Sequence, residues 1–329
     1  MGRRVWSDPE VVALSQKFVT VADEVWRLQR EDDPECRFFR KAVNGNEKMS
    51  RGSMQGTYVI TAGGVLLARQ NTASPKAIVK LLQSALVKWE QLPKTDKALK
   101  DADLVAPGFR WEQLFPIGGL HLRRTARDLP PNGDPLATPG ERFNRETVWF
   151  SAAEARSILP DSSEPGSKHS LPDQVTQRLS CLVFVDNVRG QTIPYHPSED
   201  ADSELWSEVT EVKGSRVSLT LRGGTAAKAA GPWLFTEPND WIPRDSRRYP
   251  HSISTQVLGS AVYDLSSNEF VEFNLLALGQ RKGRTINNGR GGTDQDVNDV
   301  GFVCELAPKG WRIAPTFIDV YGVEWAARP

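Results

Sequence analysis

The spacing of apolar residues predicts a run of alternating helices and strands in residues 5–93. Residues 8–17 have apolar positions at helical spacing, behind Asp8 as a cap and Pro9 in the first turn. Residues 18–22 read Phe-Val-Thr-Val-Ala, and such strand-forming residues predict a strand. Asp33 and Pro34 then begin a second helix, which ends before the turn at 44–46.

A hairpin and a long helix follow. Residues 57–60 and 65–68 flank Ala62-Gly63-Gly64, and glycines accept the positive φ angles that tight hairpin turns require. Ser74 and Pro75 begin a helix whose apolar residues repeat at helical spacing as far as Leu92. We expect one face of this helix to pack on a sheet.

After residue 109 the dominant pattern is the two-residue alternation of strands. Ser151 and Glu154 form a capping box that begins one short helix. Alternation with glycine between the strands favours an antiparallel sandwich or barrel over a parallel sheet. The predicted strands are 120–129, 181–185, 216–221, 252–263, 270–278, 301–306 and 311–323. The predicted class is therefore α+β, with an α/β domain in 1–93, a connector in 94–108 and a mostly antiparallel β domain in 109–329.

Charge and cysteine content exclude some functions. The 41 basic and 41 acidic side chains cancel, so nucleic acid is not an expected partner. No apolar run approaches the ~20 residues that span a bilayer, and as written we expect a cytoplasmic protein, although a truncated start would leave the location unknown. Cys36, Cys181 and Cys304 form no C-x-x-C pair, which indicates buried free thiols, and we expect no cofactor.

The order helix, strand, helix, hairpin, helix in residues 5–93 resembles the thioredoxin superfamily. Residues 5–19 are similar to the helix and strand after the W-C-x-x-C motif, and residues 55–60 with the following glycines are similar to the hairpin after the active-site loop. Two departures separate this chain from active members: the sequence begins where the C-x-x-C would already have passed, and Gly56 replaces the family's cis-proline. Dithiol exchange needs a low-pKa thiolate and a resolving partner, so the resemblance implies a degenerate scaffold.

The second region is similar to that of bacterial two-part proteins with a thioredoxin-like N-terminal half. Residues 127–130, 184–190 and 277–281 carry this similarity. It implies the two-part layout and no activity.

A glycine-rich cationic loop is the first candidate site. Arg281, Lys282, Arg284 and Arg290 alternate with glycines over residues 279–292, so backbone amides and guanidinium groups are both available to an anion. No Walker or dinucleotide spacing is present. The loop is either an anion site or a solvated hairpin.

Two weaker candidates use acidic residues. Asp294, Asp296 and Asn298 place oxygen atoms at alternate positions, as in a calcium loop, although Asp299 stands where that loop needs glycine. An acidic turn is the alternative. Asp186 and Arg189, at the end of an apolar segment, form either a paired site or a strand-end turn.

Three functional hypotheses remain. The leading one is a non-catalytic binding or assembly protein that takes a protein partner or a small anionic ligand. The second is a thiol-disulfide oxidoreductase whose C-x-x-C lies upstream of the given start. The third is an enzyme or anion-binding module in the β region.

Overall fold

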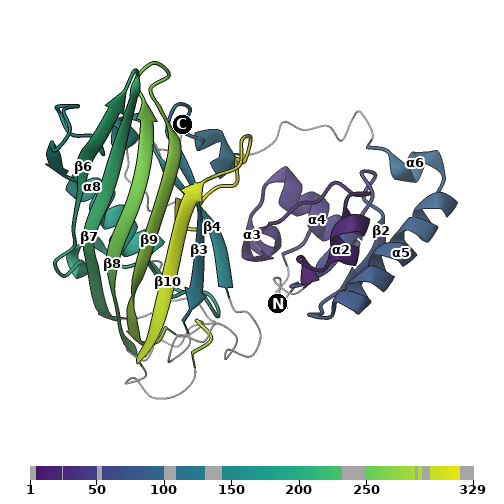
Figure 1. Ribbon diagram of the computed structural model, residues 1–329. Coiled ribbons are helices and arrows are strands. Elements are labelled where there is room, and N and C mark those ends of the chain that lie inside the picture. The colour runs from purple at the N-terminus through teal and green to yellow at the C-terminus, as the bar shows by residue number, and fades with distance from the viewer. Residues whose placement is uncertain are drawn as a thin grey trace. The chain divides into compact units, whose positions relative to one another are not determined.

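The computed structural model describes residues 5–23, 25–49, 54–99, 109–129, 143–231, 249–285, 288–290 and 297–318, without the side chains of 26, 230, 231 and 249. The chain divides into two compact units, Met1–Arg110 and Trp111–Pro329. In Figure 1 the first unit is purple to blue, and the second runs from teal through green to yellow. The short helix α6 (Lys94–Lys97), at the start of the predicted connector, lies within the first unit.

The first unit is built from helices around a two-stranded hairpin. Asp8, Asp33 and Ser74 each accept a hydrogen bond from a backbone amide at a helix start, and each precedes a proline, so these three predicted helices are confirmed. The predicted hairpin is also confirmed. The further elements of this unit are α2 (Pro9–Ser15), α3 (Val25–Arg30), α4 (Pro34–Asn44), β1 (Thr57–Ile60), β2 (Leu66–Gln70) and α5 (Pro75–Gln91).

The apolar face of α5 packs on this hairpin. Ile78, Leu82 and Ala85 are buried in one cluster with Val59 of β1 and Leu67 of β2. Helical spacing of the apolar residues in α5 therefore produces the packing that the sequence predicts.

Residues 18–22 do not form the predicted strand. They are irregular, and Val19 and Val21 are 95% and 76% exposed. Strand-forming residues need a neighbouring strand and a buried face, and no described strand pairs with this segment. The helix α3, which the sequence analysis did not predict, lies just after it.

The second unit contains one antiparallel sheet of eight strands, in the order β4-β3-β10-β9-β8-β7-β6-β5 (Figure 1). The predicted antiparallel β region is therefore confirmed, and the strands described in this unit form one sheet instead of the two sheets of the sandwich that was predicted as an alternative to a barrel. Residues 311–318 contain no strand, and the rest of the predicted strand 311–323 lies outside the described residues. The strands are β3 (Leu120–Asp128), β4 (Phe143–Phe150), β5 (Lys168–Ser170), β6 (Glu204–Lys213), β7 (Arg216–Gly231), β8 (Tyr249–Asp264), β9 (Glu269–Gly283) and β10 (Val297–Leu306).

The inner face of the sheet packs on helices from the middle of the unit. These are α7 (Ala152–Arg156), which begins at the predicted capping box, α8 (Asp173–Gln177) and a π-helix (Arg178–Val183). The π-helix occupies most of the predicted strand 181–185, which is therefore wrong. Its apolar residues join the strand side chains in one large core. A segment that is buried on every side shows no alternation of polar and apolar residues, so the sequence pattern alone cannot distinguish a strand from a helix there.

Candidate functional site

Arg290 lies between two buried carboxylates in the second unit. Its Nη2 and Nη1 donate to Oδ1 and Oδ2 of Asp128 at 2.6 and 3.0 Å. Its Nε and Nη2 donate to Oδ2 and Oδ1 of Asp186 at 2.9 and 2.5 Å. Asp128 ends strand β3 and Asp186 follows the π-helix, so Arg290 connects a strand end to the buried central segment.

Two further arginines complete this group, which we call the inner arginine cluster: Asp128, Asp186, Arg189, Arg281 and Arg290. Arg189 Nε donates to Asp128 Oδ2 at 2.7 Å. Arg281 lies 3.8 Å from Asp186 through Nε and Oδ2, while its Nη1 donates to the carbonyl of residue 283 at 2.7 Å. Three guanidinium groups therefore face two carboxylates.

Burial and charge shift the pKa values within the cluster. Burial alone would raise the pKa of Asp128, but hydrogen bonds and charge from Arg290 and then Arg189 hold it below its usual range. Burial would lower the pKa of Arg290, but its bonds to Asp186 and Asp128 raise it. Burial and the charge of Arg290 lower the pKa of Arg281, so Asp186 and Asp128 offset its positive charge only in part.

Two separate predictions from the sequence meet in this cluster. Arg281 and Arg290 of the cationic loop lie with Asp186 and Arg189 of the proposed pair. Asp186 and Arg189 take other partners, Arg290 and Asp128, instead of pairing with each other. Asp128 was not among the predicted site residues, although it ends the alternating strand β3.

The other predicted residues lie elsewhere. Lys282 is exposed on β9, and Arg284 is half-buried. Asn298 accepts a hydrogen bond from Arg281 Nη2. Asp294 and Asp296 lie outside the described residues, and among the residues that are described no group of three His, Cys, Asp or Glu side chains is arranged to hold a metal ion.

A second polar group adjoins the inner arginine cluster through Asn187. Buried Arg124 donates through Nη2 to Glu146 Oε2 at 2.5 Å, and Asn187 Oδ1 accepts from both Nη atoms of Arg124 at 3.0 Å. Asn187 Nδ2 returns a bond to Glu146 Oε1 at 2.6 Å. Consecutive residues Asp186 and Asn187 thus fix the central segment to both β3 and β4.

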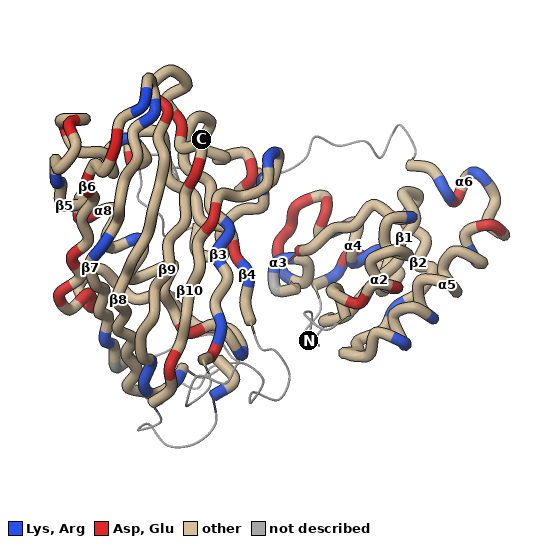
Figure 2. The backbone as a smooth tube through the Cα atoms, in the orientation of Figure 1, with Lys and Arg blue, Asp and Glu red and all other residues tan. Residues whose placement is uncertain are grey.

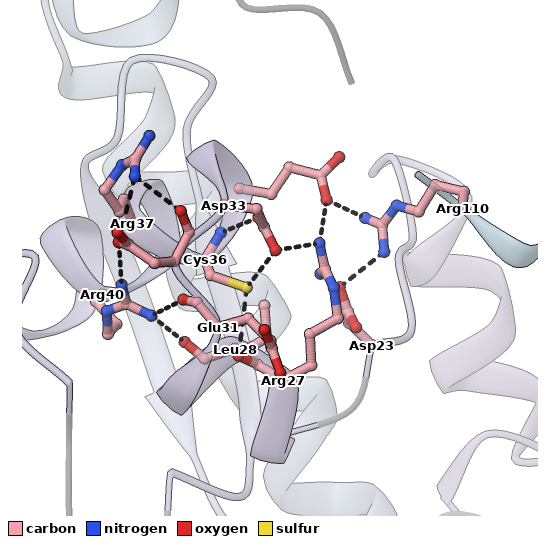
Figure 3. A network of polar contacts seen from close by, with 11 residues as sticks. Asp23, Arg27, Leu28, Glu31, Asp33, Cys36, Arg37, Arg40 and Arg110 are labelled. Carbon is pink, nitrogen blue, oxygen red and sulfur yellow. Dashed lines mark hydrogen bonds and ion pairs between the residues drawn. The ribbon is translucent and has the colours of Figure 1, made fainter. Parts of the chain in front are cut away.

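The first unit has its own polar network, centred on Arg27 (Figure 3). Arg27 donates to Asp23, Asp33 and Glu35 at 2.7, 2.8 and 2.7 Å. Arg110 pairs with Glu35 at 2.7 Å and Asp23 at 3.2 Å. This network joins α3 to α4 and to the end of the unit.

Cys36 lies inside this network and is fully buried. Its Sγ donates to Asp33 Oδ2 at 3.1 Å and lies 3.3 Å from the carbonyl of Arg27. Burial and the bond to Asp33, which stabilises the protonated thiol, raise the pKa of Cys36 to about 12. The arrangement keeps this sulfur as a thiol.

No family model, curated protein or solved structure matches this chain. None of the described helices combines the length and apolar character needed to cross a membrane. The chemistry of the chain is therefore argued from its own geometry.

The other two sulfurs are also buried and free. Burial raises the pKa of Cys181 to about 11 and that of Cys304 to about 12. All three cysteines consequently favour the protonated form, whereas nucleophilic attack requires the thiolate.

Proposed function

We propose that this chain is a non-catalytic binding or assembly protein, in which the first unit is a degenerate thioredoxin-like scaffold and the β unit presents surfaces to a ligand or partner. One observation carries the proposal: Cys36, the only cysteine in the sequence of the first unit, is buried and has a thiol pKa of about 12. At pH 7 a thiol with that pKa is ionised to about one part in 10⁵. The packing of α5 on the β1–β2 hairpin supports the proposal that the first unit is a thioredoxin-like scaffold.

The state of Cys36 can be tested by its reaction with an aromatic disulfide reagent and by insulin reduction. We expect the native protein to react at the rate of unfolding, to release three thiols promptly in denaturant and to reduce no insulin. The matched control is Cys304→Ser, which removes an equally buried thiol from the second unit. Rapid insulin reduction that Cys36→Ser abolishes and Cys304→Ser preserves would refute the proposal.

Binding of a small oxyanion is a second candidate, and the charge balance of the inner arginine cluster favours it. Three guanidinium groups face two carboxylates, so a phosphate, sulfate or carboxylate would supply the missing negative charge. Arg189 is the accessible member, because its side chain is 30% exposed and uses Nε for Asp128. Among the described residues, no partner contacts its Nη groups.

Thermal unfolding in phosphate and in chloride at equal ionic strength tests this candidate. A ligand that binds only the folded state raises the melting temperature as its concentration exceeds its dissociation constant, so we expect phosphate to stabilise the wild type and Arg189→Ala to lose that increment. Arg216→Ala is the control, since Arg216 is an exposed arginine on β7. An equal phosphate effect in both variants would remove the candidate.

A further inference from the structure

Four large aliphatic side chains are exposed on the outer face of the sheet. Leu258 on β8, Leu276 and Leu278 on β9, and Val303 on β10 are 55%, 39%, 44% and 39% exposed. We call these four residues the outer apolar patch. The side chains on the inner face of the same strands pack into the hydrophobic core, and the four patch residues are not part of that core.

The strand register makes this patch continuous. Leu258 is opposite Leu276, and Leu276 is opposite Val303, so the three form one row across the sheet. Leu278 is two residues along the same face of β9. It is opposite Gly301, where an added Cβ would lie 3.2 Å from the side chain of Leu278.

The surroundings of the patch are polar or small. In Figure 2 the middle of β8 and β9 carries no charged residue, whereas blue and red segments lie on the flanking strands and near the strand ends. Exposed faces of antiparallel sheets are normally polar, and adjacent exposed aliphatic residues mark contact sites. The outer apolar patch therefore has the character of an interaction surface.

We propose that the outer apolar patch binds the same patch on a second copy of this chain, with the two sheets face to face. A two-fold axis parallel to the strands, between β8 and β9, places Leu258 over Leu276 of the second copy and the reverse. Isologous contacts of this kind close after two copies. The inference deepens the assembly part of the proposed function and rests on it.

Charge complementarity selects a second copy as the occupant. Arg222 is exposed on β7, opposite Leu258, at one end of the apolar row. Glu305 lies on β10 two residues beyond Val303 on the same face, in the neighbouring row opposite Asn274, with a 44% exposed side chain that also pairs with Arg123. The proposed axis keeps each row at its own level, so Arg222 of one copy lies over Val303 of the other, and Glu305 of that copy is the next residue on the same face of β10. The long arginine side chain can extend along the strand to that carboxylate on both sides of the dimer.

The second row has the same symmetry. Gly224 on β7 and Gly301 on β10 lie at its two ends, with Gln256 and Leu278 between them. The axis places the two glycines over each other and permits close approach at the rim. Because a standard interface uses about 20–30 residues on each side, we expect this small contact to give a reversible dimer.

Sedimentation velocity of the full chain over a concentration series tests the proposal. We expect a monomer–dimer equilibrium whose dissociation constant rises at least about tenfold in Leu276→Glu, because the carboxylate would be desolvated in the contact. Val212→Glu is the control, since Val212 is an exposed valine on β6 outside the patch. Circular dichroism verifies that each variant is folded.

A charge swap tests the arrangement itself. Arg222→Glu and Glu305→Arg should each weaken the dimer, and the double variant should restore it, because the pair is rejoined between copies. A wild type that stays monomeric at every concentration, or a dimer unaffected by Leu276→Glu, overturns the proposal and assigns the patch to a different partner. The insulin assay is independent of this result, so the two failures are distinguishable.

Discussion

Replacing Arg290 with alanine is expected to lower the free energy of unfolding of the second unit by about 3–5 kcal/mol. Arg290 donates to both Asp128 and Asp186, and all three side chains are buried. Its removal leaves two carboxylates out of water without their main partner, a cost larger than the net value of the ion pairs. Urea unfolding followed by tryptophan fluorescence measures the change.

Two further variants make this result specific. Arg216→Ala removes an exposed arginine from the same sheet and should cost no more than about 0.5 kcal/mol. Adding Asp128→Asn and Asp186→Asn to Arg290→Ala should recover part of the lost stability, because the unpaired charges are gone. A loss below about 1 kcal/mol for Arg290→Ala would show that Arg189 and Arg281 suffice for both carboxylates.

In the first unit, the largest effect is expected at Arg40. Its buried guanidinium donates to the carbonyls of Leu28, Glu31 and Glu47 at 3.1, 2.7 and 2.7 Å, and so joins α4 to the end of α3 (Figure 3). Arg40→Ala leaves three carbonyl groups without this donor, which should cost about 2–4 kcal/mol. Hydrogen exchange should accelerate in α3 and α4 and stay unchanged in β9.

Arg37 provides the matched comparison on the same helix. Its side chain is partly exposed and pairs with exposed Asp32, so Arg37→Ala should cost about 0–1 kcal/mol. Equal exchange rates in the Arg37 and Arg40 variants would contradict the structural role of Arg40. Arg40→Lys should lie between the two, since an ammonium cannot reach three carbonyls in the geometry of a planar guanidinium.

Local signals predicted the elements whose determinants are local. The cap-proline pairs Asp8-Pro9, Asp33-Pro34 and Ser74-Pro75 place helix starts, because cap and first turn lie within a few residues. The capping box of Ser151 and Glu154 succeeded for the same reason. Strand β6 also carries alternation in its sequence, although it was not among the predicted strands.

Elements decided by their surroundings were not predictable in this way. Residues 18–22 and 181–185 share strand-forming composition, yet the first is exposed and irregular and the second is mostly π-helix. Composition reports a preference of the order of 1 kcal/mol or less per residue, whereas the availability of a neighbouring strand decides the outcome. The number of sheets likewise depends on which strands pair.

The candidate site was predictable only in part. The sequence identified Asp186, Arg189, Arg281 and Arg290, but assigned them to separate sites. It could not reveal that Asp128 neutralises Arg290, because 162 positions separate the two residues. The number of cations in the loop 279–292 therefore overstated the positive charge that is free to bind a ligand, because Arg290 is already paired with two carboxylates.

That long separation also matters while the chain is being made. A ribosome delivers Asp128 and Asp186 well before Arg290, which follows them by 162 and 104 positions, so both carboxylates are made without their main partner. Contacts between distant positions form slowly, because a large loop must close before they are rewarded. The nascent second unit therefore depends on the segment that carries Arg290, and a stalled chain that stops before residue 290 would lack the guanidinium group that pairs with both buried carboxylates.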